Sequence, residues 1–140
     1  MTPLFPSLPP GGAGCKLCPR GWPLRGDKCY WLSKQANNWT RSRDDCWGKS
    51  SRLLVLQSQE ELDSIRLVIQ GTHSVWTGVK ATFPGGKWTW VDGSPLDPAR
   101  FPVSGPVDGN SCGRLKGSQL YSEMCDVEFR WICQKDAAVI

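Results

Sequence analysis

The spacing of apolar residues changes near residue 71, and this change divides the chain into a helical part and a strand-rich part. Before it, Thr40 can cap a helix that ends near Lys49. A second helix opens at the capping box of residues 58–61, with Ser58 as the N-cap, and carries one broad apolar face until Gly71 stops it. The pattern therefore predicts two short helices in the first half of the chain.

Strands are predicted on both sides of these helices, where apolar residues alternate or form short runs. The predicted strands cover residues 26–32, 52–56, 75–79, 88–91, 113–115 and 130–134. Between residues 93 and 111 the chain has four prolines, three glycines and no period, which is typical of a long loop. Strands at both ends with two helices between them predict an α+β domain whose termini meet.

The length of 140 residues fits one domain with a tail at each end. Residues 1–17 are expected to be a flexible stalk or tail, because the first fourteen hold four prolines and three glycines. Residues 18–135 then form the domain, and residues 136–140 a C-terminal tail. The formal net charge of +4 is spread among acidic residues, so we expect no nucleic-acid partner.

Tryptophan is abundant, and most of these rings are expected in the core rather than as stacking platforms for sugars or bases. Four of them stand at alternating strand positions: Trp76, Trp88, Trp90 and Trp131. Such spacing is typical of side chains that fill the interior of a sheet-containing domain.

Seven cysteines in so short a chain indicate an oxidising compartment, and the odd number leaves one thiol over. Several disulfide connectivities are open to the sequence. Cys15 and Cys18 have the spacing of a redox or zinc motif, but prolines and glycines follow them, and His73 is the only histidine. No catalytic triad and no phosphate-binding loop is suggested either, so the sequence predicts no enzyme, no metal and no other cofactor.

The order of the cysteine and tryptophan phrases carries a family resemblance. In sequence they are Cys18, Cys29-Tyr30-Trp31, Cys46, Trp76-Thr77-Gly78, Trp88-Thr89-Trp90, Cys112, Cys125 and Trp131-Ile132-Cys133. This order resembles the C-type lectin-like domain over residues 18–135. The phrases Asn110-Ser111-Cys112 and Tyr121-Ser122-Glu123-Met124-Cys125 look like those of the natural-killer-cell lectin-like receptors of subfamily B and of their lectin-like ligands.

The resemblance implies a C-type lectin-like fold with two helices, two small antiparallel sheets, a long loop region and three disulfides. The implied pairs are Cys18–Cys29, Cys46–Cys133 and Cys112–Cys125. Cys15 is then the thiol left over. Because stalk cysteines in this family often bridge two subunits, we expect a homodimer joined through Cys15, with a free thiol as the alternative.

Sugar-binding members of the family hold calcium through two triplets rich in side-chain oxygens, since calcium takes six to eight oxygen ligands. The corresponding positions here are Gly105-Pro106-Val107 and Leu120-Tyr121-Ser122, which offer only a phenol and a hydroxyl. We therefore expect no calcium-dependent sugar binding and, on the same surface, a protein ligand. The residues expected to contact it are Arg100, Phe101, Asp108, Arg114, Lys116, Tyr121 and Glu123.

These expectations describe the extracellular part of a type II membrane receptor of the immune system, or its lectin-like counter-ligand, at the outer face of the cell membrane. The partner is expected to be a cell-surface protein, with other lectin-like proteins among the candidates. A membrane anchor is expected upstream of this segment. Asn38-Trp39-Thr40 is an N-glycosylation acceptor. The alternatives are a carbohydrate-binding lectin with a displaced or metal-free site, and a secreted toxin- or antifreeze-like relative.

Overall fold

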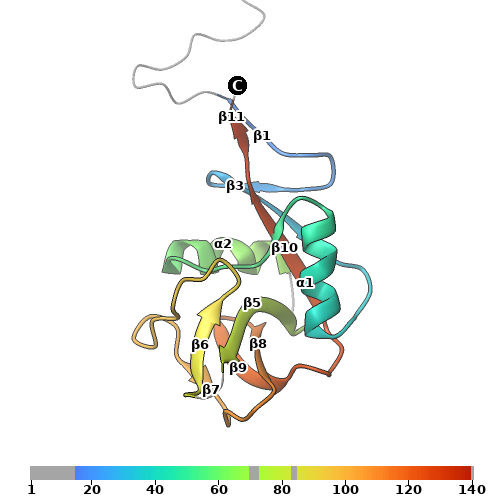
Figure 1. The fold of residues 1–140 in the computed structure, drawn as a ribbon. Helices are drawn as coiled ribbons and strands as arrows, with labels where there is room; N and C mark the ends of the chain where they lie inside the picture. The colour runs from blue at the N-terminus through green and yellow to red at the C-terminus, as the bar shows by residue number, and fades with distance from the viewer. Residues whose placement is uncertain (1–14, 70–72, 83–84, 140) are drawn as a thin grey trace, which may run out of the picture.

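The computed structural model describes residues 15–69, 73–82 and 85–139. Within these ranges the expected α+β architecture is confirmed, with two helices and mainly antiparallel strands (Figure 1). The expected tail at residues 1–14 and the expected end of the second helix at Gly71 lie outside the described residues.

Helix α1 (Trp39–Gly48) confirms the first predicted helix but not its cap. The N-cap is Asn38, whose side chain accepts a hydrogen bond from the Arg41 backbone N–H at 2.9 Å. Thr40 was the wrong choice because it already lies inside the first turn. An Asn side chain just outside the helix reaches one of the amides that the first turn leaves without an intrahelical partner.

Helix α2 (Gln59–Ile69) begins with the predicted capping box, in a slightly altered form. The Glu61 backbone N–H donates to the Ser58 hydroxyl at 3.2 Å, as predicted. The Glu61 carboxylate accepts from the Gln57 backbone N–H at 2.6 Å. In a standard capping box the donor would be the N-cap residue itself, Ser58. The apolar face of the helix is buried through Leu62, Ile65 and Ile69.

All six predicted strands are present, and shorter strands accompany them. The strands of the described residues are β1 (Lys16–Leu17), β2 (Leu24–Arg25), β3 (Lys28–Leu32), β4 (Arg52–Leu53), β5 (Val75–Thr82), β6 (Lys87–Trp90), β7 (Val103–Ser104), β8 (Ser111–Lys116), β9 (Gln119–Met124), β10 (Arg130–Asp136) and β11 (Ala138–Val139). The strand expected at residues 52–56 is shorter than predicted. Only β4 pairs with a neighbouring strand, while residues 54–56 are buried but form no strand pairing. Strand β9 was not predicted, since polar residues interrupt its alternation.

The strands form two groups joined by a short parallel contact. In the upper group β3 pairs with β2 and β10, and β4 also pairs with β10. In the lower group β5 pairs with β6 and β8, and β9 pairs with β8 and β7. Parallel pairing of β10 with β5 connects the groups, so the two expected small sheets share one continuous strand order.

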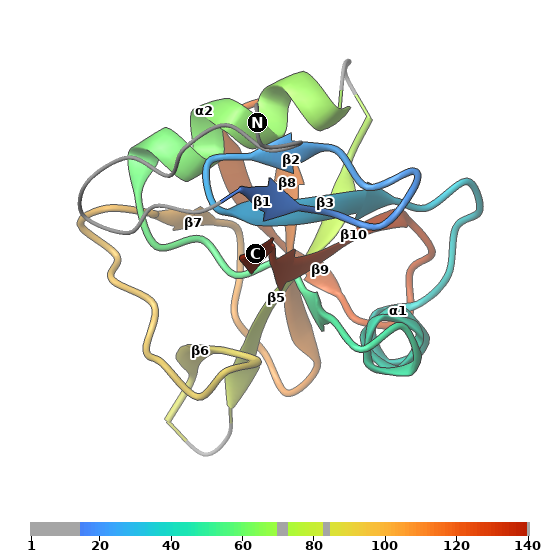
Figure 2. The same ribbon diagram turned by 90° about the horizontal axis from the view of Figure 1, so that it is seen from above.

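The chain ends and the long loop lie at opposite ends of the molecule. Strands β1 and β11 pair at the end where the chain enters and leaves, and Figures 1 and 2 show both near the same point. Strand β7 and the β8–β9 hairpin lie at the other end (Figure 1). Residues 16–17 and 138–139, which the sequence assigned to tails, are therefore paired strands.

Large aromatic side chains fill the interior, largely as expected. Trp76, Trp90 and Trp131 are buried, while Trp88 is half-buried and packs against the core. Gly78 is required by this packing, since a Cβ there would lie 2.6 Å from the Leu53 carbonyl oxygen. The Trp76-Thr77-Gly78 phrase thus lets β5 approach the chain at residues 53–54.

Three disulfides join the pairs that the resemblance implies. Cys18–Cys29 fastens the first residues of the described chain to β3. Cys46–Cys133 ties α1 to β10, and Cys112–Cys125 joins the start of β8 to the residue after β9. Cys15 is exposed and forms no disulfide within the chain.

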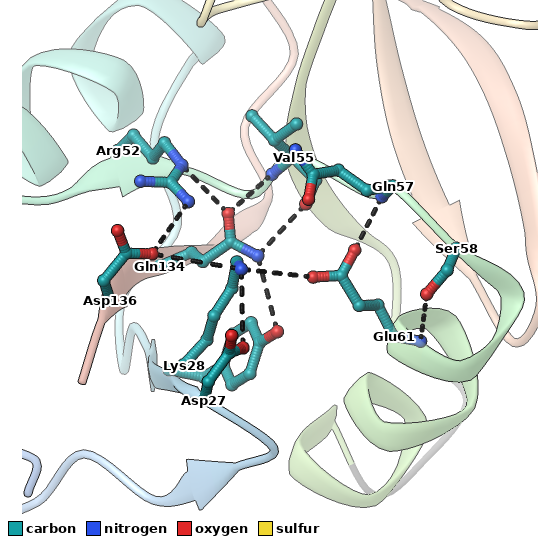
Figure 3. A network of polar contacts seen from close by, with 10 residues as sticks. Asp27, Lys28, Arg52, Val55, Gln57, Ser58, Glu61, Gln134 and Asp136 are labelled. Atoms are coloured by element: carbon teal, nitrogen blue, oxygen red, sulfur yellow. Dashed lines mark hydrogen bonds and ion pairs between the residues drawn. The ribbon is translucent and has the colours of Figure 1, made fainter. Parts of the chain in front are cut away.

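Polar side chains from β3, β4, β10 and α2 meet around buried Gln134 (Figure 3). We call this group the polar centre; its members are Lys28, Tyr30, Arg52, Glu61 and Gln134. Gln134 is fully buried. Its carbonyl oxygen accepts from Arg52 Nε at 3.0 Å, and its amide donates to the Val55 carbonyl at 3.0 Å. Lys28 Nζ lies 3.8 Å from Glu61 Oε2, which links β3 to α2.

Burial raises the pKa of Tyr30 above its ordinary value near 10, because the charged phenolate would lose its water. The hydrogen bond from the Gln134 amide opposes this shift, and the Glu61 carboxylate adds to it. Tyr30 is therefore held neutral as an acceptor for Gln134 Nε2, 3.4 Å away.

Candidate functional site

The β8–β9 hairpin brings together three of the residues expected to bind a ligand: Arg114, Tyr121 and Glu123. Arg114 stands directly opposite Tyr121 in the antiparallel register, and Cys112 stands opposite Glu123. Since side chains two residues apart on a strand share a face, Arg114, Tyr121 and Glu123 project from the same face of the hairpin. We call them the Arg114 cluster.

Arg114 is held in place by contacts on several sides. Its Nε lies 3.2 Å from Glu123 Oε1, and its NH1 donates to the Ser74 hydroxyl at 2.9 Å. The guanidinium lies 4.7 Å from the Tyr121 ring centroid and 5.6 Å from that of Phe129. A guanidinium fixed by a carboxylate and by two rings has lost most of its rotamer freedom before any ligand arrives.

The Arg114 cluster is neither buried nor fully solvated. The side chains of Arg114 and Glu123 are 21% and 28% exposed, and Tyr121 is also half-buried. Lys116, at the end of the same strand, is exposed and belongs to the same face by strand periodicity. This face therefore offers a cation, an anion and an aromatic ring at its surface.

The other expected ligand-binding residues lie elsewhere. Arg100 is exposed, and its guanidinium donates to the Gln57 carbonyl at 3.2 Å, near the start of α2. Asp108 is exposed in the turn before β8, where its carboxylate accepts from the Asn110 backbone N–H at 3.0 Å. Neither residue contacts the Arg114 cluster.

The expectation that Phe101 is an exposed anchor for a ligand is wrong, because its side chain is buried. It is only 6% exposed and packs edge-on against Trp90, with ring centroids 6.4 Å apart. The long loop uses this ring to fasten itself to the core, which its position among prolines and glycines did not reveal.

Two residues that support the cluster were missed from the sequence, Ser74 and Phe129. Phe129 reaches Arg114 because its backbone forms a bridge with Asn37, which is far away in sequence. Its ring also packs edge-on against Trp76, with centroids 5.0 Å apart. No local pattern could have found this contact, since it depends on how the chain returns from β9 to β10.

The positions of the family's calcium triplets do come together, although their atoms do not suit the ion. Parallel pairing of β7 with β9 places residues 103–104 beside residues 120–121. The Ser122 hydroxyl donates to the Pro106 carbonyl. Among the described residues no group of three or more His, Cys, Asp or Glu side chains could hold a metal ion. The donor set therefore does not fit calcium, which takes six to eight oxygens, several of them from carboxylates.

Neither α1 nor α2, the helices of the described residues, is long and apolar enough to cross a membrane.

Comparison with known proteins places this geometry in a family. Residues 35–135 match the family model described as the lectin C-type domain. Killer cell lectin-like receptor subfamily F member 2 of Homo sapiens is 41% identical over 121 residues, which cover 86% of this chain and 58% of the relative. Killer cell lectin-like receptor subfamily B member 1B allele C of Rattus norvegicus is 38% identical over 120 residues, 85% of this chain and 54% of the relative. The chain thus spans little more than half the length of these relatives.

Solved structures agree with the family match. The carbohydrate-recognition domain of the mouse scavenger receptor C-type lectin has a TM-score of 0.77 and 29% identity, covering 86% of this chain and 99% of that one. A calcium-independent type II antifreeze protein has a TM-score of 0.75 and 26% identity, covering 89% and 98%. The expected fold is confirmed, and the resemblance extends to receptors of subfamily F as well as subfamily B. By its fold, its disulfides and its match over residues 35–135, the chain belongs to the C-type lectin domain family.

Proposed function

We propose that this chain is the extracellular recognition domain of a cell-surface immune protein, and that it binds a protein ligand without calcium and without catalysis. The protein is either a killer-cell-type receptor or the lectin-like counter-ligand of one. The supporting observation is the pairing of two features at one end of the fold. The triplet positions carry no carboxylate, and the second triplet supplies Tyr121 to the half-exposed Arg114 cluster.

The composition of the Arg114 cluster suits a protein partner. Arginine and tyrosine are enriched among the side chains that contribute most to protein interfaces. Arg114 and Tyr121 are already stacked, so binding would cost little side-chain entropy. Lys116, on the same face, is then a candidate for the polar rim, where single charges affect the association rate more than affinity. Arg100 and Asp108 would take part only if the ligand extends beyond this face.

The position of the face supports the same proposal. The strands β1 and β11, next to the chain ends, lie opposite the β8–β9 hairpin (Figure 1). If the chain is anchored to a membrane upstream of residue 15, the hairpin that carries the Arg114 cluster lies at the end of the domain far from that attachment. A ligand on an opposing cell surface could then reach it.

A parallel screen tests the proposal. The oxidised domain is offered to an array of cell-surface proteins that includes lectin-like members, and to a glycan array, each with calcium and with EDTA. We expect binding to a protein that EDTA does not change and that Tyr121→Ala weakens. Binding only to glycans, and only in calcium, would overturn the proposal.

We also propose that Cys15 links two copies of the chain. Its thiol is exposed, and nearby Leu17 and Val139 on β1 and β11 are 51% and 65% exposed, an apolar surface that a second copy could cover. Non-reducing electrophoresis of the protein secreted by cultured cells should give a dimer that Cys15→Ser abolishes. A monomer in both cases would contradict the bridge.

Glycosylation of Asn38 is the last part of the proposal. As the N-cap of α1, Asn38 uses its Oδ1 atom, whereas a glycan is attached at Nδ2, so capping and modification can coexist. Mass spectrometry of the secreted protein before and after amidase treatment measures occupancy. Thr40→Ala, which removes the acceptor but keeps the cap, is the control.

A further inference from the structure

A second surface, separate from the Arg114 cluster, is the groove between α1 and the β5–β6 hairpin. It has a volume of about 370 Å³. Its lining residues are Trp39, Arg43, Asp44, Trp47, Lys80, Thr82, Thr89, Trp90 and Val91. We call it the Trp47 groove, because the Trp47 side chain at its edge is 62% exposed. The fold gives this ring little cover, although exposed tryptophan is costly in water.

Strand register gives the wall opposite Trp47 a defined chemistry. Lys80 stands opposite Thr89, and Thr82 stands opposite Lys87. Paired residues, and residues two apart on a strand, share one face of the hairpin. Since Lys80, Thr82 and Thr89 line the groove, Lys87 belongs to the same face. The wall therefore presents two ammonium groups and two hydroxyls.

The charges of the groove leave a positive excess. Arg43 NH2 lies 3.1 Å from Asp44 Oδ1, so these two charges largely compensate each other. The Lys80 ammonium lies 5.3 Å from the Trp39 ring centroid, and no carboxylate oxygen of the described residues lies within 4.0 Å of it. With Lys87 added, the groove carries a net charge near +2 beside an apolar indole. This combination complements a ligand that is anionic and also has an apolar face.

The groove continues past Trp47. A second hollow of about 490 Å³ shares Trp47 and Val91 with the first. Its charged residues, Arg52, Lys135, Asp92 and Asp136, balance one another, so the positive excess stays at the Lys80 side of Trp47. The two hollows together form an open trough around one exposed ring. An elongated ligand, with its anionic groups at the Lys80 side, fits such a shape better than a compact ligand, which needs an enclosed pocket.

We propose that the Trp47 groove binds a sulfated polysaccharide. The apolar C–H face of a sugar ring would stack on the Trp47 indole, sulfates would lie against Lys80 and Lys87, and ring hydroxyls would contact Thr82 and Thr89. The site needs no metal ion and includes none of the triplet residues. It is also independent of the protein ligand proposed for the Arg114 cluster.

Salt dependence of binding to size-defined heparin oligosaccharides tests the inference. Each cation that contacts a polyanion releases counterions, so removing one contact lowers the slope of log Kd against log salt by about one. We expect that change for Lys80→Gln. Lys34→Gln, an exposed lysine outside the Trp47 groove, changes the net charge equally and should leave the slope unchanged.

Stacking on Trp47 is tested with Trp47→Ala. Loss of one stacked ring should weaken oligosaccharide binding about tenfold. The folded state should be unaffected, because the side chain is largely exposed; an unchanged unfolding midpoint checks this. Desulfated heparin should not bind to the wild type.

Two outcomes would overturn the inference. One is an equal loss of slope in Lys80→Gln and Lys34→Gln, which would mean that only the general positive charge attracts heparin. The other is binding of sulfotyrosine peptides with no binding of oligosaccharides, which would assign the groove to an acidic peptide. Tyr121→Ala should retain oligosaccharide binding and Trp47→Ala should retain protein binding, so the two proposals can fail separately.

Discussion

The polar centre and the Arg114 cluster use the same kinds of side chain for different purposes. Each places an arginine, a tyrosine and a carboxylate close together, and each lies beside a disulfide. In the polar centre the connecting residue, Gln134, is fully buried and its amide is hydrogen-bonded at both ends. In the Arg114 cluster the side chains of Arg114 and Glu123 remain 21% and 28% exposed.

This difference separates residues that hold the fold from residues that can meet a partner. A buried polar group without a partner costs free energy, so Gln134 and Tyr30, the buried members of the polar centre, depend on their hydrogen bonds. A half-exposed group keeps water as an alternative partner, so its loss costs the fold little. We therefore expect substitutions in the first region to lower stability and substitutions in the second to lower binding.

The largest effect on stability should come from removing a disulfide, with both cysteines of the pair replaced. Cys46 and Cys133 are 87 residues apart, and Cys112 and Cys125 are 13 apart. Replacing the first pair by alanine should lower the free energy of unfolding by about 4 to 5 kcal/mol, and replacing the second by about 3 kcal/mol, since the longer bridge restricts the unfolded chain more. Denaturant unfolding measures both. A larger cost for the 112–125 pair would contradict the comparison.

Gln134→Ala should have the next largest effect. It leaves Arg52, Val55 and the Tyr30 hydroxyl without their shared partner, and we expect a loss of about 2 to 3 kcal/mol. Gln35→Ala, an exposed glutamine, is the matched control and should change stability by less than about 0.5 kcal/mol. Similar losses in the two variants would mean that the polar centre does not stabilise the fold.

Alkaline pH should also destabilise the protein through Tyr30. Its pKa is raised in the folded state, so the unfolded chain releases this proton at lower pH. The stabilisation by neutral Tyr30 is complete below about pH 10 and is lost as the pH rises from there through the folded-state pKa. The free energy of unfolding, measured from neutral pH to above about pH 10, should fall more steeply for wild type than for Tyr30→Phe. The same dependence of unfolding free energy on pH in both proteins would show that Tyr30 does not cause the alkaline loss.

The smallest effect on stability is expected in the Arg114 cluster. Glu123→Gln removes a partly solvated ion pair and should lower the free energy of unfolding by no more than about 1 kcal/mol. The same equilibrium experiment measures it beside Gln134→Ala. A loss as large as that of Gln134→Ala would remove the distinction between the two regions.

The sequence predicted the parts of the fold that local patterns encode. The capping box at Ser58, the alternating tryptophans and the order of the cysteine phrases led to both helices, to the main strands and, through the family resemblance, to the disulfides. It did not predict β9, whose residues do not alternate cleanly. The cap at Asn38 was missed because several polar residues compete at that helix start.

The site was predictable only in part, because its contacts come from distant segments. Arg114, Tyr121 and Glu123 were identified individually, but Ser74 and Phe129 reach them only in the folded chain. Phe101 was misplaced because burial of one loop residue depends on how the loop folds back onto Trp90. The Trp47 groove likewise needs the register of β5 with β6, which no single segment contains.

The central claim is that the Arg114 cluster recognises a protein without calcium. The most direct test uses the partner that the screen identifies. Its affinity is measured for wild type, Tyr121→Ala and Gln35→Ala, each in calcium and in EDTA. We expect Tyr121→Ala to weaken binding at least about tenfold at unchanged stability, Gln35→Ala to bind like wild type, and EDTA to change nothing. Full affinity of Tyr121→Ala, or loss of wild-type binding in EDTA, would contradict the account.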